Sequence, residues 1–310
     1  MKNILLTGGT GFFGKSILDY CAQRRCDRHF TLLSRHGLNR TFALSLRNEG
    51  YEFDEIHGDV RSFDVGGRHF DAIIHAAAAL NPALSDEEII SSTVDGTRHV
   101  IDMAKSISCK TILYTSSGAV YGKRMKSVDE NDACNPDTPY GMAKVAAEHI
   151  LLDSGLDVKI ARCFAFVGRH LDRGIYYAIG NFIQNCLDNE PIVIKGDGTP
   201  LRSYLYADDL VEWLFAILDR GEPGRPYNVG SPKGLSISEL AETVRSALDT
   251  QNDIIIQGAP SPKPCASRPP PTYVPITSRA ESELGLRVTV PLAEAIRLSA
   301  TQSKLVYDKA

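Results

Sequence analysis

The sequence lacks the hallmarks of three broad classes of protein. It has no apolar run that approaches the length of a membrane span, and its first residues are strand-like and leave no room for a signal peptide, so we expect a cytoplasmic protein with no membrane partner. Its 34 Lys and Arg are outnumbered by 38 Asp and Glu, for a formal net charge of −4, and they form no basic stripe, which argues against nucleic acid as a partner. Its seven cysteines are scattered without the spacing of metal ligands, which indicates reduced side chains and no metal site.

Over its first half the chain alternates regularly between segments with the hydrophobic pattern of strands and segments with that of helices. Its 310 residues suffice for one large domain or two intimate ones. Short apolar runs alternate with amphipathic stretches, a pattern typical of parallel strands joined by helices. The sequence therefore predicts an α/β fold, a Rossmann-like doubly wound parallel sheet, with strands over residues 3–7, 30–34, 72–75, 111–115 and 158–162 and helices over residues 16–24, 86–106 and 139–154.

The alternation loosens in the second half. We expect a dinucleotide-binding domain over residues 1–165 and a smaller α/β C-terminal substrate-binding lobe over residues 166–310, with the chain able to exchange between the two. Helices are expected over residues 207–219 and 236–248. The stretch 258–275 carries seven prolines, and the sequence leaves open whether it is a linker or an ordered loop over a site.

A glycine-rich turn follows the first predicted strand. Gly8 permits a tight turn, Gly11 lets the backbone approach a pyrophosphate, and Gly14 lets the following helix lie against the sheet. The amino end of that helix supplies N–H groups and a positive dipole to the same phosphates. A glycine pattern occurs by chance when isolated, but one between a strand and a helix favours dinucleotide binding by Gly8, Thr10, Gly11, Phe12, Phe13 and Gly14.

The residues after the second predicted strand bear on which dinucleotide binds. Proteins that select NAD usually have a carboxylate there, which accepts from the ribose hydroxyls and repels a 2′-phosphate. This chain has Ser34 and Arg35 instead and no acid before Glu49, so we expect NADP (NADPH) in preference to NAD, with the guanidinium paired to the phosphate. The alternative is that Arg35 is an exposed surface residue. Asp59 and Val60, after the third strand-like run, fit a contact with the adenine edge.

A second motif can move a proton. Tyr140 and Lys144 are four residues apart and project from one face of the helix predicted from Pro139 onward. A nearby ammonium favours the phenolate and lowers the pKa of a tyrosine from its usual value near 10. Lys144 can also hydrogen-bond the nicotinamide ribose, and Ser117, shortly after the strand over 111–115, can hold the substrate oxygen beside the tyrosine. A Tyr and a Lys at this spacing are common, and only their combination with the glycine turn indicates nicotinamide-dependent redox chemistry at a carbinol or ketone.

These motifs resemble those of the extended short-chain dehydrogenase/reductases, the NAD-dependent epimerase/dehydratase family, over nearly the whole chain. Further matching segments are His75–Ala78, Val94–Thr97, Arg162 before Val167–Gly168, Gly196–Gly198, Arg202–Tyr204 and Asp208–Leu210. The resemblance implies that Ser117, Tyr140 and Lys144 are catalytic. It also implies that the cofactor is contacted by Ala76, Ala77, Ala78, Tyr140 and Lys144.

The resemblance further implies a homodimer and a nucleoside diphosphate sugar as substrate. The substrate residues it implies are Ser116, Ser117, Asn181, Arg202, Arg268 and Tyr273. For three of them the sequence allows a purely structural role instead. Asn181 could cap a helix, Arg202 could pair with Asp209, and Arg268 could be a solvated surface residue. His75, at the end of a strand, is likewise either a hydrogen-bonded structural residue or a proton carrier.

The chain departs from the family pattern at several positions. Thr93 and Ala165 stand where the family often has asparagine, which suggests altered contacts around the active-site helix and the sugar. Gly118 and Ala119 stand where sugar 4,6-dehydratases carry an Asp-Glu pair, and neither side chain can transfer a proton, so dehydration is not expected.

Segments 161–167 and 178–183 resemble bacterial reductases of nucleotide-linked 4-keto-6-deoxyhexoses. The expected function is therefore reduction of such a sugar, with hydride from the nicotinamide and the proton from Tyr140. Two alternatives stay open: a sugar epimerase with tightly held NAD, and a cofactor-sensing regulator without catalysis. The presence of all three residues Ser117, Tyr140 and Lys144 argues against the regulator, because a protein without catalysis does not need a catalytic set.

Overall fold

The computed structural model describes residues 2–78, 83–174, 177–259 and 269–301, and the chain in it divides into two compact units. The chain crosses between them more than once. Unit 1 comprises Met1–Gly122, Asp132–Cys163 and Val211–Tyr227, and unit 2 comprises Lys123–Asn131, Phe164–Leu210 and Asn228–Ala310.

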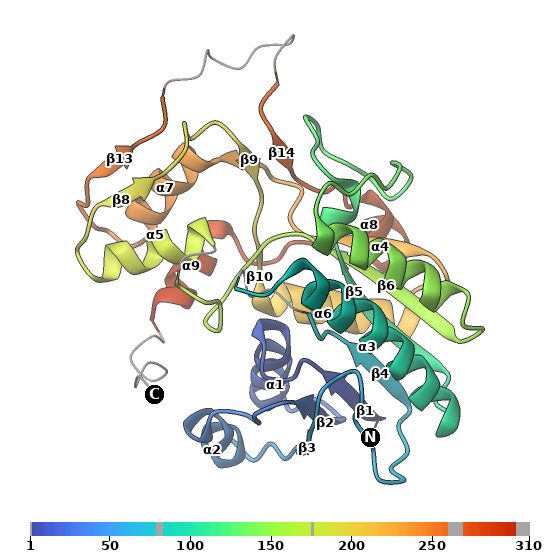
Figure 1. Cartoon of the computed structure of the whole chain (residues 1–310). Coiled ribbons are helices and arrows are strands. Elements are labelled where there is room, and N and C mark those ends of the chain that lie inside the picture. Colours follow the sequence, from blue (N-terminus) through green and yellow to red (C-terminus); the bar gives the residue numbers. More distant parts are fainter. Residues whose placement is uncertain (1, 79–82, 175–176, 260–268, 302–310) are drawn as a thin grey trace. The chain divides into compact units, whose positions relative to one another are not determined.

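Unit 1 is built on a seven-stranded sheet in the order β11-β6-β5-β4-β1-β2-β3 (Figure 1). Its strands are β1 (Lys2–Thr7), β2 (Arg28–Ser34), β3 (Asp54–His57), β4 (Ala72–His75), β5 (Thr111–Ser117), β6 (Asp157–Cys163) and β11 (Pro226–Val229). The pairs among β1 to β6 are all parallel. The strand order reverses between β1 and β4, and ligands of such sheets bind beyond the carboxyl ends of the strands at this point. The predicted α/β fold with a parallel central sheet is confirmed.

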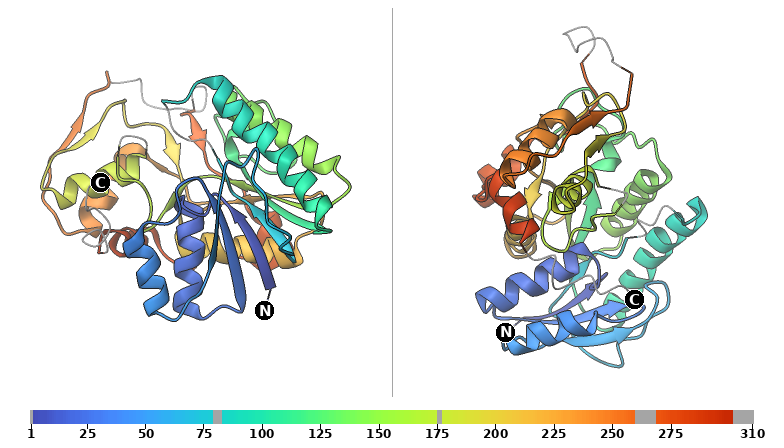
Figure 2. Two further views of the ribbon diagram at one scale, coloured as in Figure 1. Left: turned by 60° about the horizontal axis from the view of Figure 1, so that its bottom comes forward. Right: turned by 90° about the vertical axis from the view of Figure 1, so that its left-hand side faces the viewer.

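Four helices join these strands: α1 (Phe12–Arg24), α2 (Arg40–Asn48), α3 (Asp86–Ser106) and α4 (Pro139–Leu152). The last two lie side by side in both views of Figure 2. Ser85 caps α3 by accepting from the Glu88 N–H at 3.2 Å, and Thr138 caps α4 by accepting from the Gly141 N–H at 3.1 Å. The helix expected over 86–106 has those bounds, whereas α2 was not expected because it is only nine residues long.

The core of unit 1 lies between the sheet and these helices. Leu5, Ile73, Ile112 and Ile160 come from four adjacent strands and are fully buried. Buried apolar residues follow one another along these strands, as expected of parallel strands that are covered on both faces. The site at the strand ends is therefore carried by a rigid support.

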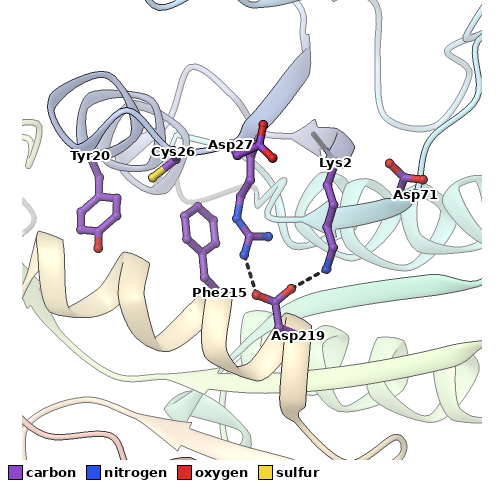
Figure 3. Close-up of a pocket in the computed structure, with 8 residues that line it drawn as sticks. Lys2, Tyr20, Cys26, Asp27, Asp71, Phe215 and Asp219 are labelled. Atoms are coloured by element: carbon purple, nitrogen blue, oxygen red, sulfur yellow. Dashed lines mark hydrogen bonds and ion pairs between the residues drawn. The ribbon is translucent and has the colours of Figure 1, made fainter.

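A surface pocket of about 620 Å³ lies at the opposite, amino end of β1 and β2 (Figure 3). It is bordered by the last turns of α6 (Ala207–Arg220), whose residues from 211 onward belong to unit 1. Asp219 accepts from the ammonium of Lys2 at 2.8 Å and from the guanidinium of Arg28 at 2.5 Å. The Arg28 guanidinium also lies 4.3 Å from the centroid of the Phe215 ring. These contacts hold the end of α6 to the start of two strands.

The described residues of unit 2 form short helices and very short strands. The helices are α5 (Ala178–Leu187), α7 (Ile237–Ala247), α8 (Ser278–Leu284) and α9 (Leu292–Ala300). The strands are β7 (Phe166–Val167), β8 (Ile192–Ile194), β9 (Leu201–Arg202), β10 (Leu205–Tyr206), β12 (Leu235–Ser236), β13 (Ile254–Ile256) and β14 (Thr272–Tyr273). They form a three-stranded sheet in the order β12-β9-β14 and the two pairs β10-β7 and β13-β8.

Two features are absent from the described residues, a membrane-spanning helix and a cluster of metal ligands. None of their helices is both long enough and apolar enough to cross a bilayer. Within the same ranges, no three His, Cys, Asp or Glu side chains gather in a way that could hold a metal ion.

Candidate active site

The glycine turn between β1 and α1 has no room for side chains. Gly8 has φ +75°, and a Cβ atom there would lie 2.8 Å from the carbonyl oxygen of Ala76. A Cβ atom on Gly14 would lie 2.2 Å from the carbonyl oxygen of Gly9. The Gly8 N–H donates to the Leu33 carbonyl at 3.1 Å, which fastens the turn to β2. The turn thus leaves bare backbone at the carboxyl edge of the sheet.

The first turn of α1 fits a diphosphate. Gly11 is the N-cap in an extended conformation, and no side-chain hydrogen bond caps the helix there. Phe12 and Phe13 are the first two helical residues, and Thr10 lies in the turn before them. The partial positive charge at a helix amino end favours an anion, and the glycines of the turn, which lack Cβ atoms, let that anion approach the backbone. The residues present therefore fit the pyrophosphate of a dinucleotide.

The loop after β4 lies directly against this turn. The Ala77 N–H donates to the hydroxyl of Thr7 at 3.1 Å, and the Ala76 N–H donates to the Thr7 carbonyl at 3.3 Å. Ala76 and Ala77 also make the close approach to Gly8 described above. Ala78 is exposed at the end of the described part of this loop. The structure therefore brings these predicted cofactor residues together at the point where the strand order reverses.

The ends of β2 and β3 carry the other predicted cofactor residues. The buried Ser34 hydroxyl accepts from the Gly37 N–H at 3.0 Å, and Arg35 is exposed. Asp59 accepts from Nε and Nη2 of Arg61 at 2.8 and 2.7 Å, and this bidentate hydrogen bonding lowers the pKa of Asp59 to about 2. Val60 follows it and is half-buried. The sequence analysis missed Arg61, although an arginine two residues after an aspartate is a pattern that allows such a pair.

The three predicted catalytic residues all belong to unit 1. Ser117 is the last residue of β5, and its Oγ accepts from the Ala119 N–H at 3.1 Å, which leaves the hydroxyl proton available. Tyr140 and Lys144 lie on consecutive turns of α4. The Nζ atom of Lys144 lies 5.8 Å from the centroid of the Tyr140 ring and donates to the Thr115 carbonyl at 2.8 Å.

Lys144 is 1% exposed, and its burial sets its ionisation. Burial lowers the pKa of Lys144 to about 8, and the charge of the neighbouring Glu148 acts against that decrease. The side chain is therefore still mostly charged at neutral pH, with its ammonium 5.8 Å from the centroid of the Tyr140 ring. This is the arrangement that favours ionisation of a tyrosine.

The hydrogen bonds of His75 indicate a structural role. Thr97 donates its hydroxyl proton to the Thr93 carbonyl at 2.6 Å, so it accepts from His75 Nε2 at 3.1 Å. His75 Nδ1 then accepts from the hydroxyl of Thr7 at 2.8 Å, which fixes the neutral tautomer with the proton on Nε2. Burial, and secondarily the charge of Lys144, lower the pKa of His75 to about 3. Of the two roles left open by the sequence, the structure supports the structural one.

Ser116 is placed differently from Ser117. It is 3% exposed, and its hydroxyl donates to the buried carboxylate of Glu148. Only its oxygen lone pairs therefore remain for a substrate. The sequence analysis missed Glu148, whose position four residues after Lys144 on the same helix face is the signal that could have found it.

In unit 2 the structure places two predicted substrate residues side by side. Arg202 of β9 and Tyr273 of β14 are register partners, and the guanidinium carbon of Arg202 lies 5.7 Å from the centroid of the Tyr273 ring. Asp209, the alternative partner of Arg202, accepts instead from the backbone N–H groups of Thr289 and Val290 at 3.1 and 3.2 Å.

The other two predicted substrate residues of this half have different outcomes. The N-cap of α5 is Tyr177, and Asn181 is the fourth helical residue, with its N–H donating to the Tyr177 carbonyl at 2.9 Å. The alternative that Asn181 caps the helix is therefore wrong. Arg268 lies outside the described residues, as does most of the proline-rich stretch.

A parallel sheet with a glycine turn at its switch point, a Ser at the end of β5 and a Tyr and a Lys on α4 defines an enzyme of the extended short-chain dehydrogenase/reductase type. The chain belongs to the NAD dependent epimerase/dehydratase family, whose profile matches residues 4–230.

Three comparisons indicate the range of chemistry among similar proteins. The chain is 27% identical to UDP-glucuronic acid decarboxylase 6 of Arabidopsis thaliana, over 95% of this chain and 87% of that protein. It is 29% identical to a putative UDP-glucose 4-epimerase of Methanocaldococcus jannaschii, over 95% of this chain and 96% of that protein. A crystal structure of UDP-glucuronic acid 4-epimerase from Bacillus cereus, in complex with UDP-glucuronic acid and NAD, shares the fold with a TM-score of 0.83 at 20% identity, over 98% of this chain and 100% of that one.

Proposed function

We propose that the protein transfers hydride between a nicotinamide cofactor and the C4 carbon of a nucleoside diphosphate sugar. The observation that carries this proposal is the buried ammonium of Lys144 close to the ring of Tyr140, in the same unit as a turn that fits a pyrophosphate. The similar proteins named above act on UDP-linked sugars, which supports the substrate class. When bound, the nicotinamide supplies or takes up the hydride.

The side chains of this unit divide the proton chemistry among them. Ser117 donates a hydrogen bond to the sugar oxygen, because its own oxygen already accepts from the backbone. Tyr140 gives its phenolic proton to that oxygen during reduction and takes it back during oxidation. Lys144 stabilises the phenolate that results, and its hydrogen bond to the Thr115 carbonyl holds the ammonium in place.

We propose NADPH as the preferred cofactor. The support is that the carboxyl end of β2 presents Ser34 and the exposed Arg35, with no carboxylate among them. On the neighbouring strand β3, Glu55 accepts from the Leu38 N–H at 2.8 Å, and beyond the end of that strand Asp59, whose carboxylate is paired with Arg61, lies within electrostatic reach of Arg35. The exposed guanidinium of Arg35 at this edge is better suited to bind a 2′-phosphate than to bind an unmodified ribose.

The net reaction we propose is reduction of a nucleotide-linked 4-keto-6-deoxy sugar. Gly118 and Ala119 follow Ser117 in the η1 turn (Gly118–Tyr121), where an acid and a base would be required for dehydration. A cofactor that is consumed in each turnover is consistent with NADPH. Arg202 and Tyr273 of unit 2, with Asn181 and Arg268, are proposed to bind the nucleoside diphosphate.

Epimerisation at C4 is the second candidate. It is supported by the similarity to the putative UDP-glucose 4-epimerase over 95% of this chain and 96% of that protein. It requires the same Ser117, Tyr140 and Lys144 and no further catalytic group, because oxidation and reduction occur at one carbon. The two candidates differ only in whether the hydride returns to the same sugar.

Incubation with NADPH and a 4-keto-6-deoxy nucleotide sugar, followed at 340 nm and by chromatography, separates the candidates. A reductase consumes cofactor and sugar one for one. An epimerase converts UDP-glucose or UDP-glucuronic acid without net consumption and releases NAD when it is denatured. A protein that changes none of these compounds contradicts the proposal. Light scattering on the same preparation tests the homodimer that the family resemblance predicts.

A further inference from the structure

A buried ion pair lies behind the predicted catalytic residues of unit 1. Glu148 is 3% exposed and lies one turn beyond Lys144 on the same face of α4. Arg162 of β6 donates to both of its carboxylate oxygens, from Nε to Oε1 at 3.1 Å and from Nη2 to Oε2 at 2.7 Å. The remaining Nη1 of Arg162 donates to the hydroxyl of Tyr121 at 3.1 Å. Bidentate pairs of this kind fix geometry as well as charge.

The same carboxylate holds the end of β5. Ser116 donates to Oε1 of Glu148, and it is also the register partner of Arg162 across the β5–β6 pair. Ser117 is the next residue along the strand. Glu148 thus connects three elements: the helix of the proton donor, the strand that ends in Ser117, and β6.

The charge of Glu148 also reaches Lys144. It acts against the decrease in the pKa of Lys144 that burial causes. The titratable groups that face the lysine from the elements around it are His75 on β4, Tyr114 on β5 and Cys163 on β6. The buried residues of α3 carry no titratable side chain. All three facing groups are neutral at neutral pH, because burial keeps each in its uncharged form.

We propose that Glu148 is a positioning residue for hydride transfer: through Ser116 it fixes the strand end that carries Ser117 against the helix that carries Tyr140. Glu148 does not touch the substrate. It acts through the geometry of Ser117 and through its charge beside Lys144. The inference rests on the proposed function, because that function assigns the proton transfer to Ser117 and Tyr140.

The first test removes one hydroxyl and keeps every charge. Ser116→Ala should lower kcat about tenfold or more and leave KM for sugar and cofactor within about twofold, because a small misplacement of a catalytic group is costly. The matched control is Thr111→Val at the other end of β5, which removes a 3.2 Å hydrogen bond from a hydroxyl to the Asp157 carboxylate. This control should leave kcat within about twofold. Equal loss of kcat in the two variants overturns the inference.

The second test needs no substrate. In protein labelled with [ε-¹³C]lysine, NMR titration follows the ionisation of Lys144, which the Lys144→Met variant identifies. Glu148→Gln should lower the pKa of Lys144 below the value of about 8 that the intact site has. Ser116→Ala should leave it unchanged, because the carboxylate stays in place. An unchanged pKa in Glu148→Gln contradicts the electrostatic part of the inference.

The two tests separate the inference from the proposed function. If the unmodified protein turns over no nucleotide sugar, the proposed function fails, and the titration alone decides whether Glu148 controls Lys144. If it is active but Ser116→Ala behaves like Thr111→Val, the function stands and the positioning role fails.

Discussion

The Nζ atom of Lys144 donates a hydrogen bond to the backbone carbonyl of Thr115 across 2.8 Å. This bond joins the active-site helix to the strand that ends in Ser117 two residues later. The bond uses one of the three N–H donors of the ammonium, and two remain for other acceptors. A lysine that is 1% exposed and held in this way has little freedom, so the position of its charge and the direction of its N–H groups are both fixed.

Replacing Tyr140 with Phe should leave cofactor binding nearly intact and reduce turnover by about 10²–10⁴-fold, the range typical of general acid catalysis. Lys144→Ala should weaken both, because the lysine is proposed to serve the ribose and the phenol. Steady-state kinetics and cofactor titration by fluorescence measure the two effects. Near-normal turnover in Tyr140→Phe would move the proton transfer to another group.

Replacing Arg35 with Asp should raise KM for NADPH about 10–100-fold and change KM for NADH far less, because the guanidinium is proposed to pair with the 2′-phosphate. Arg98→Asp is a matched control, since Arg98 has a side chain 59% exposed on α3 and gives the same change of charge. An equal response of the two cofactors to Arg35→Asp would mean that Arg35 does not contact the phosphate.

Arg202→Ala should weaken substrate binding about 10–100-fold without changing cofactor affinity, because a diphosphate in a cleft needs cationic partners. Arg287→Ala, which removes an arginine 70% exposed in the same unit, should change neither. Isothermal titration with the free nucleoside diphosphate gives the affinity directly. Arg268→Ala is expected to resemble Arg202→Ala, and normal binding by both variants would place the nucleotide elsewhere.

His75 should make the protein less stable in acid. Its pKa is about 3 in the folded chain and near 6.5 when unfolded, so the unfolded state binds more protons between these values. The free energy of unfolding therefore falls as the pH drops through this window, by up to about 1.4 kcal/mol per pH unit. Urea unfolding at pH 7, 6 and 5 should show a shallower decline for His75→Asn. Parallel declines would show that His75 titrates alike in both states.

Much of unit 1 could be predicted from the pattern of the sequence. The strands now seen as β1, β2, β4, β5 and β6 were expected within two residues at each end, because buried parallel strands are continuous apolar runs. The strands of unit 2 were not expected, since several of them contain only two residues and no period can be read from so few. The alternative that Asn181 caps a helix is wrong, because the N-cap of α5 is Tyr177, whose side chain makes no capping hydrogen bond and leaves no signal in the sequence.

The sequence by itself determined the α/β fold and the glycine turn, and it placed Tyr140 and Lys144 on one face of a helix, because each depends on residues close together in the chain. Only the tertiary structure decided the ionisation of Lys144, the tautomer of His75 and the partner of Ser116. Each of these depends on burial and on residues brought together from distant strands: Thr7 with His75, and Ser116 with Glu148 and Arg162. The sequence shows which ionisable groups are present, whereas their charge states depend on which of them are buried together away from water.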